Sequence, residues 1–141
     1  MEKFVIEGGV PLTGTVTPAG NKNGALPCLA AAVLTDQEVV LRNVPRIRDV
    51  EAMLELLEHL GATVRWDGDN EVAVCAAGVT EESVIDADAA ERIRASFLLA
   101  GPLLARYGRA TMPAPGGDVI GRRRHDPPLD AFRALGASDE P

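Results

Sequence analysis

The sequence contains only two cysteines, and it lacks the run of about 20 apolar residues that a membrane-spanning helix needs. Two cysteines are too few for a disulfide scaffold. The first residues also lack the basic and apolar regions of a secretory signal peptide. The sequence therefore predicts neither a membrane segment nor export, and it favours the cytoplasm.

Signatures of common cofactor sites are absent as well. The glycine-rich dinucleotide fingerprint and the P-loop are both missing. Cys28, Cys75, His59 and His125 do not show the spacing of metal ligands. We therefore expect no cofactor and no metal. We interpret Cys28 as part of an apolar helix, Cys75 as a strand residue and His59 as a helix surface residue.

Basic residues are outnumbered, with 14 Lys and Arg against 21 Asp and Glu and a net charge of −7. This balance argues against nucleic-acid binding through bulk electrostatics. A small anionic ligand remains compatible, because it needs only local positive charge. Residues 122–125 form a basic block, Arg-Arg-Arg-His. The block fits either a solvated face or part of an anion site.

The length of 141 residues suits one compact domain or part of a larger one, and 46% of the residues are apolar. Apolar periodicity and turn residues predict alternating helices and strands. We expect Asn21 and Asp49 to cap helices, and we allow a break near residues 101–102. The predicted strands are 4–8, 14–17, 38–42, 63–66, 71–75 and 109–112. The predicted helices are 24–34, 49–60, 89–107 and 128–135.

An internal repeat runs through this pattern. Residues 57–62 resemble residues 132–137 at an offset of 75 residues, the offset from Gly61 to Gly136. The repeated unit reads helix, strand, helix and two strands, and the second copy stops after its second helix. We expect the chain to be a truncated piece of a longer protein, because losing two strands leaves an exposed sheet edge.

Three places carry candidate chemistry. In residues 20–24, Gly-Asn-Lys-Asn-Gly, a helix N-terminus and Lys22 suit a phosphate or carboxylate, although an ordinary capped turn fits equally well. Arg92 and Arg94 precede an apolar stretch. They are either candidate ligand-binding residues or ordinary surface charges on a helix before its buried part. Residues 115–124 place a carboxylate among glycines and arginines, which fits either a lid over an anion or a surface loop.

These places together resemble a known family. The motifs are Lys22-Asn23 after a glycine turn, Arg94-Ala95-Ser96, and residues 116–121, Gly-Gly-Asp-Val-Ile-Gly, followed by Arg123. They are similar to the UDP-N-acetylglucosamine 1-carboxyvinyltransferases, the enolpyruvyl transferases that begin bacterial peptidoglycan synthesis. The resemblance runs along the whole chain and covers roughly the first third of a family member.

The resemblance implies an α/β fold, an inside-out α/β barrel built from βαβαββ units, with the second unit incomplete here. Residues 1–20 would be strands that belong with the second domain of longer relatives. Residues 21–141 would form a partial enolpyruvyl transferase domain. The remaining C-terminal part of the enzyme is then an expected partner, whereas nucleic acid and membranes are not.

The resemblance also implies an activity, the transfer of enolpyruvyl from phosphoenolpyruvate to the 3′-hydroxyl of UDP-N-acetylglucosamine by addition and elimination. Lys22 would contact phosphoenolpyruvate, Asn23 the sugar nucleotide, and Arg94 the substrate near the reaction centre. Phosphate and uracil-nucleotide groups would be held by Arg123, Arg124, His125, Asp126 and Pro127.

The chain departs from the family at Asp118, where most members have a cysteine that donates a proton. A protonated carboxyl group can perform the same step. Because no thiol stands at Asp118, we hypothesise resistance to fosfomycin, which alkylates that cysteine. A second departure is Pro127-Pro128, where members usually have a less rigid helix entrance.

The resemblance implies that other residues needed for turnover lie beyond this chain, so we expect these 141 residues alone to be inactive. Two alternatives stay open. One is the shikimate-pathway enolpyruvyl transferase, which has the same fold. The other is a non-catalytic fragment that binds UDP-sugars or assembles with a partner.

Overall fold

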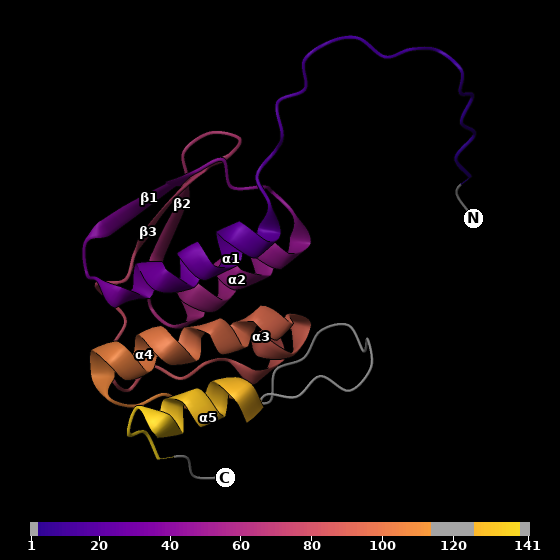
Figure 1. Cartoon of the computed structure of the whole chain (residues 1–141). Coiled ribbons are helices and arrows are strands. Elements are labelled where there is room, and N and C mark those ends of the chain that lie inside the picture. The colour runs from indigo at the N-terminus through magenta and orange to yellow at the C-terminus, as the bar shows by residue number, and fades with distance from the viewer. Residues whose placement is uncertain (1–2, 114–125, 139–141) are drawn as a thin grey trace.

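The computed structural model describes residues 3–113 and 126–138 (Figure 1). The strands are β1 (Glu38–Arg42), β2 (Thr63–Trp66) and β3 (Glu71–Cys75). The helices are α1 (Lys22–Ala31), α2 (Arg48–His59), α3 (Ala87–Arg92), α4 (Ala100–Tyr107) and α5 (Asp126–Ala134), with 3₁₀ segments η1 (Ala32–Leu34) and η2 (Arg94–Leu99). No helix within these described ranges is long and apolar enough to cross a membrane.

The elements stack in layers. Figure 1 shows the sheet on one side, α1 and α2 beneath it, then α3 and α4, and α5 on the outside. The sheet is antiparallel in the order β1-β3-β2. The three strands have the predicted bounds, because each has β-branched residues and is bounded by turn residues. The predicted α/β class is confirmed.

The first helix follows the predicted signals closely. The side chain of Asn21 accepts a hydrogen bond from the backbone N–H of Asn23 at 2.7 Å, so the predicted cap is confirmed. Pro27 lies within α1. The end of the helix tightens into η1, which places Val33 in the core beside Leu29.

The predicted cap of α2 is wrong. Ile47 occupies the N-cap position and makes no side-chain cap, whereas Asp49 lies inside the first turn. The carboxylate of Asp49 is instead turned toward Lys22. At its other end α2 stops at Gly61, as predicted, with φ of 103°. The hydrogen bond from Ala62 N to Leu57 O, 2.9 Å long, closes this end.

The single helix predicted over residues 89–107 is also wrong, because it is divided into α3, η2 and α4. The break lies at Ile93, whose backbone is extended (φ −139°, ψ 136°), and not at residues 101–102. The extended residue redirects the chain so that Ile93, Ser96 and Leu99 are all buried. The Ser96 hydroxyl donates to Ile93 O at 3.0 Å, so the one fully buried polar side chain among residues 3–113 and 126–138 has a hydrogen-bond partner.

Three predicted strands do not form in the described residues: 4–8, 14–17 and 109–112. A strand needs a partner for its backbone N–H and C=O groups, and none of these segments has one here. Residues 3–20 run outward from the body as an extended arm (Figure 1), with Phe4, Ile6 and Leu12 exposed. The assignment of residues 1–20 to a second domain stays a prediction.

The internal repeat reappears in the geometry of the helix ends. In α5, Ala137 N donates to Phe132 O at 3.0 Å, and Gly136 has φ of 97°. These features match the end of α2 at the predicted offset. Unlike α2, however, α5 buries none of its residues among the described parts of the chain.

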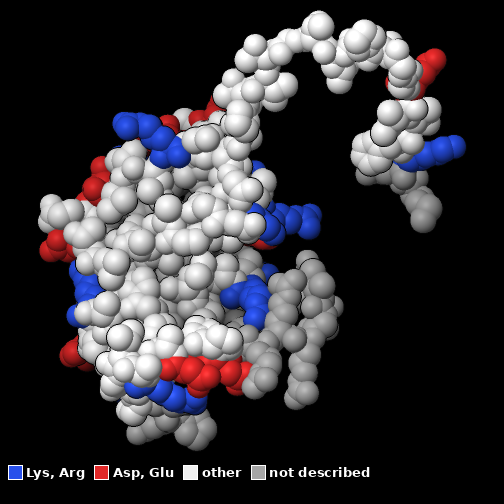
Figure 2. All heavy atoms as spheres, viewed as in Figure 1, with Lys and Arg blue, Asp and Glu red and all other residues white. Residues whose placement is uncertain are grey.

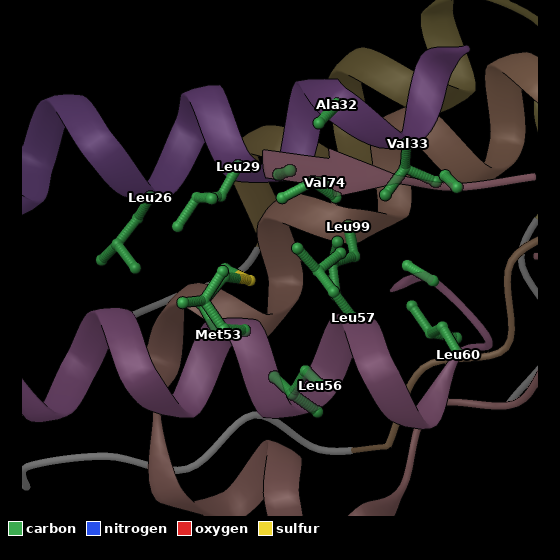
Figure 3. Close-up of a cluster of buried hydrophobic side chains, with 14 of the residues drawn as sticks. Leu26, Leu29, Ala32, Val33, Met53, Leu56, Leu57, Leu60, Val74 and Leu99 are labelled. Carbon is green, nitrogen blue, oxygen red and sulfur yellow. The ribbon is translucent and has the colours of Figure 1, made fainter. Parts of the chain in front are cut away.

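The core lies between α1, α2 and β3. Figure 3 shows α1 and α2 running in the same direction, with Leu26 and Leu29 facing Met53 and Leu57. Val74 of β3 and Leu99 of η2 close the cluster. All of these side chains are almost fully buried. The layer of α1 and α2 is therefore fixed by aliphatic packing, which sets where their ends lie.

One guanidinium connects α4 to the first copy of the repeat. Arg106 Nη1 donates to Val33 O and Ala76 O, each at 3.0 Å, and more weakly to Thr35 O at 3.4 Å. Val33 lies in η1, Thr35 directly follows η1, and Ala76 directly follows β3. Arg106 therefore pairs with the carbonyls at the end of η1, and it adds a second donor to Ala76 O, which also accepts from Val79 N at 3.2 Å.

We expect Arg106→Met to lower the free energy of unfolding by about 1–3 kcal/mol, because Val33 O and Thr35 O lose their side-chain donor, while Ala76 O keeps only its bond from Val79 N. Chemical denaturation would measure the loss. Arg42→Met is the matched control, since Arg42 is exposed and pairs with Glu71 at the surface, where a pair contributes less than about 1 kcal/mol. Equal losses in the two variants would contradict this role of Arg106.

Candidate anion-binding site

The N-terminal ends of α1 and α2 lie at one edge of the molecule (Figure 1). Lys22 is the first residue of α1 and Asp49 the second of α2, and Lys22 Nζ lies 2.5 Å from Asp49 Oδ2. Figure 2 shows basic side chains at the edge where these two helices begin. Parallel helices that start together bring two partial positive charges to the same place.

The turn before α1 is packed tightly against the loop before α2. A Cβ atom on Gly20 would lie 1.7 Å from Asn43 O and 2.9 Å from Pro45 Cδ, so only glycine fits there. Asn43 itself has a positive φ of 58°. This contact fixes the position of residues 20–23 relative to α2, so that Lys22 and Asn23 start from a defined backbone.

Lys22 and Asn23 are both accessible to a ligand. The side chain of Lys22 is 49% exposed, and its ammonium keeps two N–H donors beyond the one used for Asp49. The Asn23 side chain is exposed and makes no hydrogen bond to another described residue. A cation and an amide next to a helix N-terminus suit a phosphate or carboxylate.

Arg94 lies on a different element. It begins η2, which packs against α1, and its side chain is half-buried without an ion pair to any described residue. No hydrogen bond joins it to Lys22 or Asn23. Arg92, the other arginine singled out from the sequence, pairs with Glu55 at 2.7 Å and so connects α3 to α2.

Part of the predicted site lies outside the described residues, namely Asp118, Arg123, Arg124 and His125. Asp126 and Pro127 are described and form the first turn of α5. Proline is well accommodated in a first turn, because its missing N–H would be unpaired there in any case. The structure thus places Lys22, Asn23, Arg94, Asp126 and Pro127, and it joins Lys22 to Asn23 in one turn.

Asp49 is the residue that sequence reasoning missed. Its place at the start of a helix favoured a capping role, and nothing local in the sequence relates it to Lys22, 27 residues earlier. The available signal was that both residues occupy first turns of successive helices around one strand. That signal becomes specific only once the helices are known to be parallel.

Other polar features lie apart from this edge. A hollow of about 440 Å³ is lined by residues 80–84, 107 and 109–111 together with Leu103, and none of the predicted site residues lines it. On the hairpin, hydrogen bonds from the Arg65 guanidinium lower the pKa of the Asp67 carboxyl. No group of three or more potential metal ligands occurs among residues 3–113 and 126–138.

Comparisons with known proteins agree on a family. The family model described as EPSP synthase (3-phosphoshikimate 1-carboxyvinyltransferase) matches residues 6–140. A protein of Bradyrhizobium diazoefficiens named UDP-N-acetylglucosamine 1-carboxyvinyltransferase is 50% identical over 96% of this chain and 31% of its own length. A protein of Treponema denticola with the same name is 48% identical over 99% of this chain and 33% of its own length.

A solved structure supports the same conclusion. The enolpyruvyl transferase NikO from Streptomyces tendae is similar over 69% of this chain and 22% of its own, with a TM-score of 0.59 and 29% identity. The chain spans about a third of the length of the curated relatives it matches. By its sequence and its fold, the chain belongs to the EPSP synthase family of enolpyruvyl transferases.

Proposed function

We propose that the chain is part of an enzyme that transfers the enolpyruvyl group of phosphoenolpyruvate to the 3′-hydroxyl of UDP-N-acetylglucosamine. The observation that carries this proposal is the half-exposed Lys22 ammonium at the shared N-terminal edge of α1 and α2. Relatives at 42–50% identity named for this reaction support the choice of substrates.

The negative charge of phosphoenolpyruvate must be neutralised by cationic residues before its methylene carbon is protonated. Phosphoenolpyruvate carries a phosphate and a carboxylate, and their charge opposes the approach of a nucleophile. Lys22 neutralises the phosphate at the helix N-terminus, while the Asn23 amide donates to and accepts from the sugar nucleotide. Arg94 adds a second cation near the reacting carbon. Arg123, Arg124, His125, Asp126 and Pro127 hold the phosphate and uracil-nucleotide groups.

The reaction proceeds in two balanced steps. The sugar oxygen bonds to C2 of phosphoenolpyruvate as the methylene carbon accepts a proton from the Asp118 carboxyl group, which gives a tetrahedral ketal. The ketal then loses phosphate as a methyl proton returns to the Asp118 carboxylate, which restores the double bond. The family resemblance assigns the base for the sugar hydroxyl to the part of the enzyme beyond these 141 residues. We expect no phosphate release from these 141 residues alone.

The shikimate-pathway reaction is the competing function within this family. It uses the same donor but a different acceptor, shikimate 3-phosphate. The names of the relatives favour the sugar nucleotide, since the proteins 42–50% identical to this chain are UDP-N-acetylglucosamine 1-carboxyvinyltransferases. Direct binding of the two acceptors distinguishes the two functions.

The test is a titration of the chain with phosphoenolpyruvate, UDP-N-acetylglucosamine and shikimate 3-phosphate, followed by amide NMR shifts. We expect the first two ligands to shift the amides of Lys22 and Asn23 at millimolar concentration, which corresponds to about −4 kcal/mol of binding. Lys22→Ala should weaken phosphoenolpyruvate binding about tenfold or more, since a hydrogen bond to a charged group contributes about 1.5–3 kcal/mol.

Lys3→Ala is the matched control for that titration, because Lys3 lies on the exposed arm. It removes the same charge and should leave binding unchanged. Preference for shikimate 3-phosphate over the sugar nucleotide would move the chain to the competing function. No shift with any of the three ligands at about 10 mM would contradict a substrate site in this chain.

A further inference from the structure

Lys22 is held by a partner from another helix. Its ammonium donates to Asp49 Oδ2 at 2.5 Å, although the two side chains are 49% and 40% exposed and are both free to extend into water. We propose that Asp49 is a positioning residue, which holds the Lys22 ammonium at the shared edge of α1 and α2 so that its other two N–H bonds receive the phosphate of phosphoenolpyruvate. This inference rests on the function proposed above.

The position of Asp49 is itself well fixed. It lies in the first turn of α2, where the helix dipole favours a carboxylate. The α2 backbone is locked against α1 by the buried layer of Leu29, Met53 and Leu57 (Figure 3). Gly20 also packs against the loop that leads into α2. Asp49 therefore holds the end of a flexible side chain at a place that the core defines.

The neighbouring arginines do not compete for Asp49. Arg46 lies over the Trp66 ring, 4.7 Å from its centroid, and its Nε is 3.9 Å from Glu51. Arg48 is exposed and makes no ion pair with Asp49. Among the described residues, Lys22 is thus the cation that Asp49 holds. The pair is specific, although it lies at the surface.

Positioning and plain electrostatics predict opposite results when Asp49 is neutralised. A free lysine side chain loses much rotamer freedom when it binds an anion, and a lysine already held by Asp49 loses less. Removing that hold should weaken binding. If Asp49 were only a nearby negative charge, or an anion that the substrate must displace, its removal should strengthen binding.

The experiment measures the dissociation constant of phosphoenolpyruvate for the wild-type chain and for Asp49→Asn, Asp49→Glu, Glu51→Gln and Lys22→Ala. Glu51→Gln is the matched control, since Glu51 also lies in the first turn of α2, is exposed and loses the same charge. We expect Asp49→Asn to weaken binding about three- to tenfold, the scale of one immobilised side chain. Asp49→Glu should recover part of the loss, and Glu51→Gln should not weaken binding.

The outcomes separate this inference from the function on which it rests. Wild-type binding that is lost in Lys22→Ala but unchanged or tighter in Asp49→Asn would overturn the positioning role alone. No wild-type binding, or equal binding by wild type and Lys22→Ala, would overturn both. The NMR line width and order parameter of the Lys22 ε-methylene group measure the mobility of this side chain and give a second readout. They should report a more mobile side chain in Asp49→Asn, while a folded spectrum shows that the variant retains its structure.

Discussion

Replacing Leu60 by alanine should lower the free energy of unfolding by about 2–5 kcal/mol, whereas the same change at Leu135 should alter it by less than about 0.5 kcal/mol. The two leucines occupy equivalent places in the repeat, one residue before the glycine that ends α2 or α5. Leu60 is 2% exposed and belongs to the core, while Leu135 is 86% exposed. The difference arises from burial alone, because the local sequence and the helix ends are alike.

Urea denaturation measures both variants against the wild type, and the linear dependence of the free energy on denaturant gives each loss. Unchanged slopes would show that the folded state keeps its compactness. Losses of similar size at the two positions would contradict the arrangement described, since they would mean that α5 buries Leu135 in solution.

Gly61→Ala should be the more damaging of two glycine substitutions with the same backbone geometry. Gly61 and Gly136 have φ of 103° and 97°, so alanine is strained at both positions by about 1–2 kcal/mol. A Cβ on Gly61 would also lie 2.6 Å from Gly78 O, whereas no atom of the described residues lies within 4 Å of a Cβ on Gly136. We expect Gly61→Ala to cost about 1–3 kcal/mol more than Gly136→Ala.

Gly78→Ala isolates the contact from the backbone strain. Its Cβ would lie 2.3 Å from Gly61 O, and Gly78 does not have a positive φ. Thermal unfolding of the three variants should give the largest loss for Gly61→Ala, with Gly78→Ala losing about 1–3 kcal/mol through the clash alone. If Gly61→Ala and Gly136→Ala melted together, the close approach of the two glycines would not restrict the chain.

Local signals were sufficient for much of the fold. The three strands and the capped start of α1 follow from alternating β-branched residues, turn residues and Asn21, all of which act within a few residues. The break at Ile93 does not follow from them, because residues 94–99 have the composition of a helix. It depends on burial against α1 and α2, which are distant in the sequence. Segments 4–8 and 109–112 have strand composition but lack a partner here.

The candidate site, like the fold, could be predicted from the sequence only in part. Lys22 and Asn23 could be singled out because a glycine turn, a cap and a basic residue stand together in the sequence. Asp49 could not, since its ion pair with Lys22 exists only through the parallel packing of α1 and α2. The place of Arg94 likewise depends on η2, which packs against α1 and follows the unpredicted break at Ile93.

The hydrogen bonds of Arg106 bear on cooperativity. In a repeat protein, stability is approximately the sum of each copy's own stability and a coupling energy between neighbouring copies. Arg106 lies in the second copy, and the carbonyls of Val33 and Ala76 lie in the first. Its guanidinium therefore contributes to the coupling energy. This coupling favours a single unfolding transition, in which α4 unfolds together with the end of β3 and the end of η1.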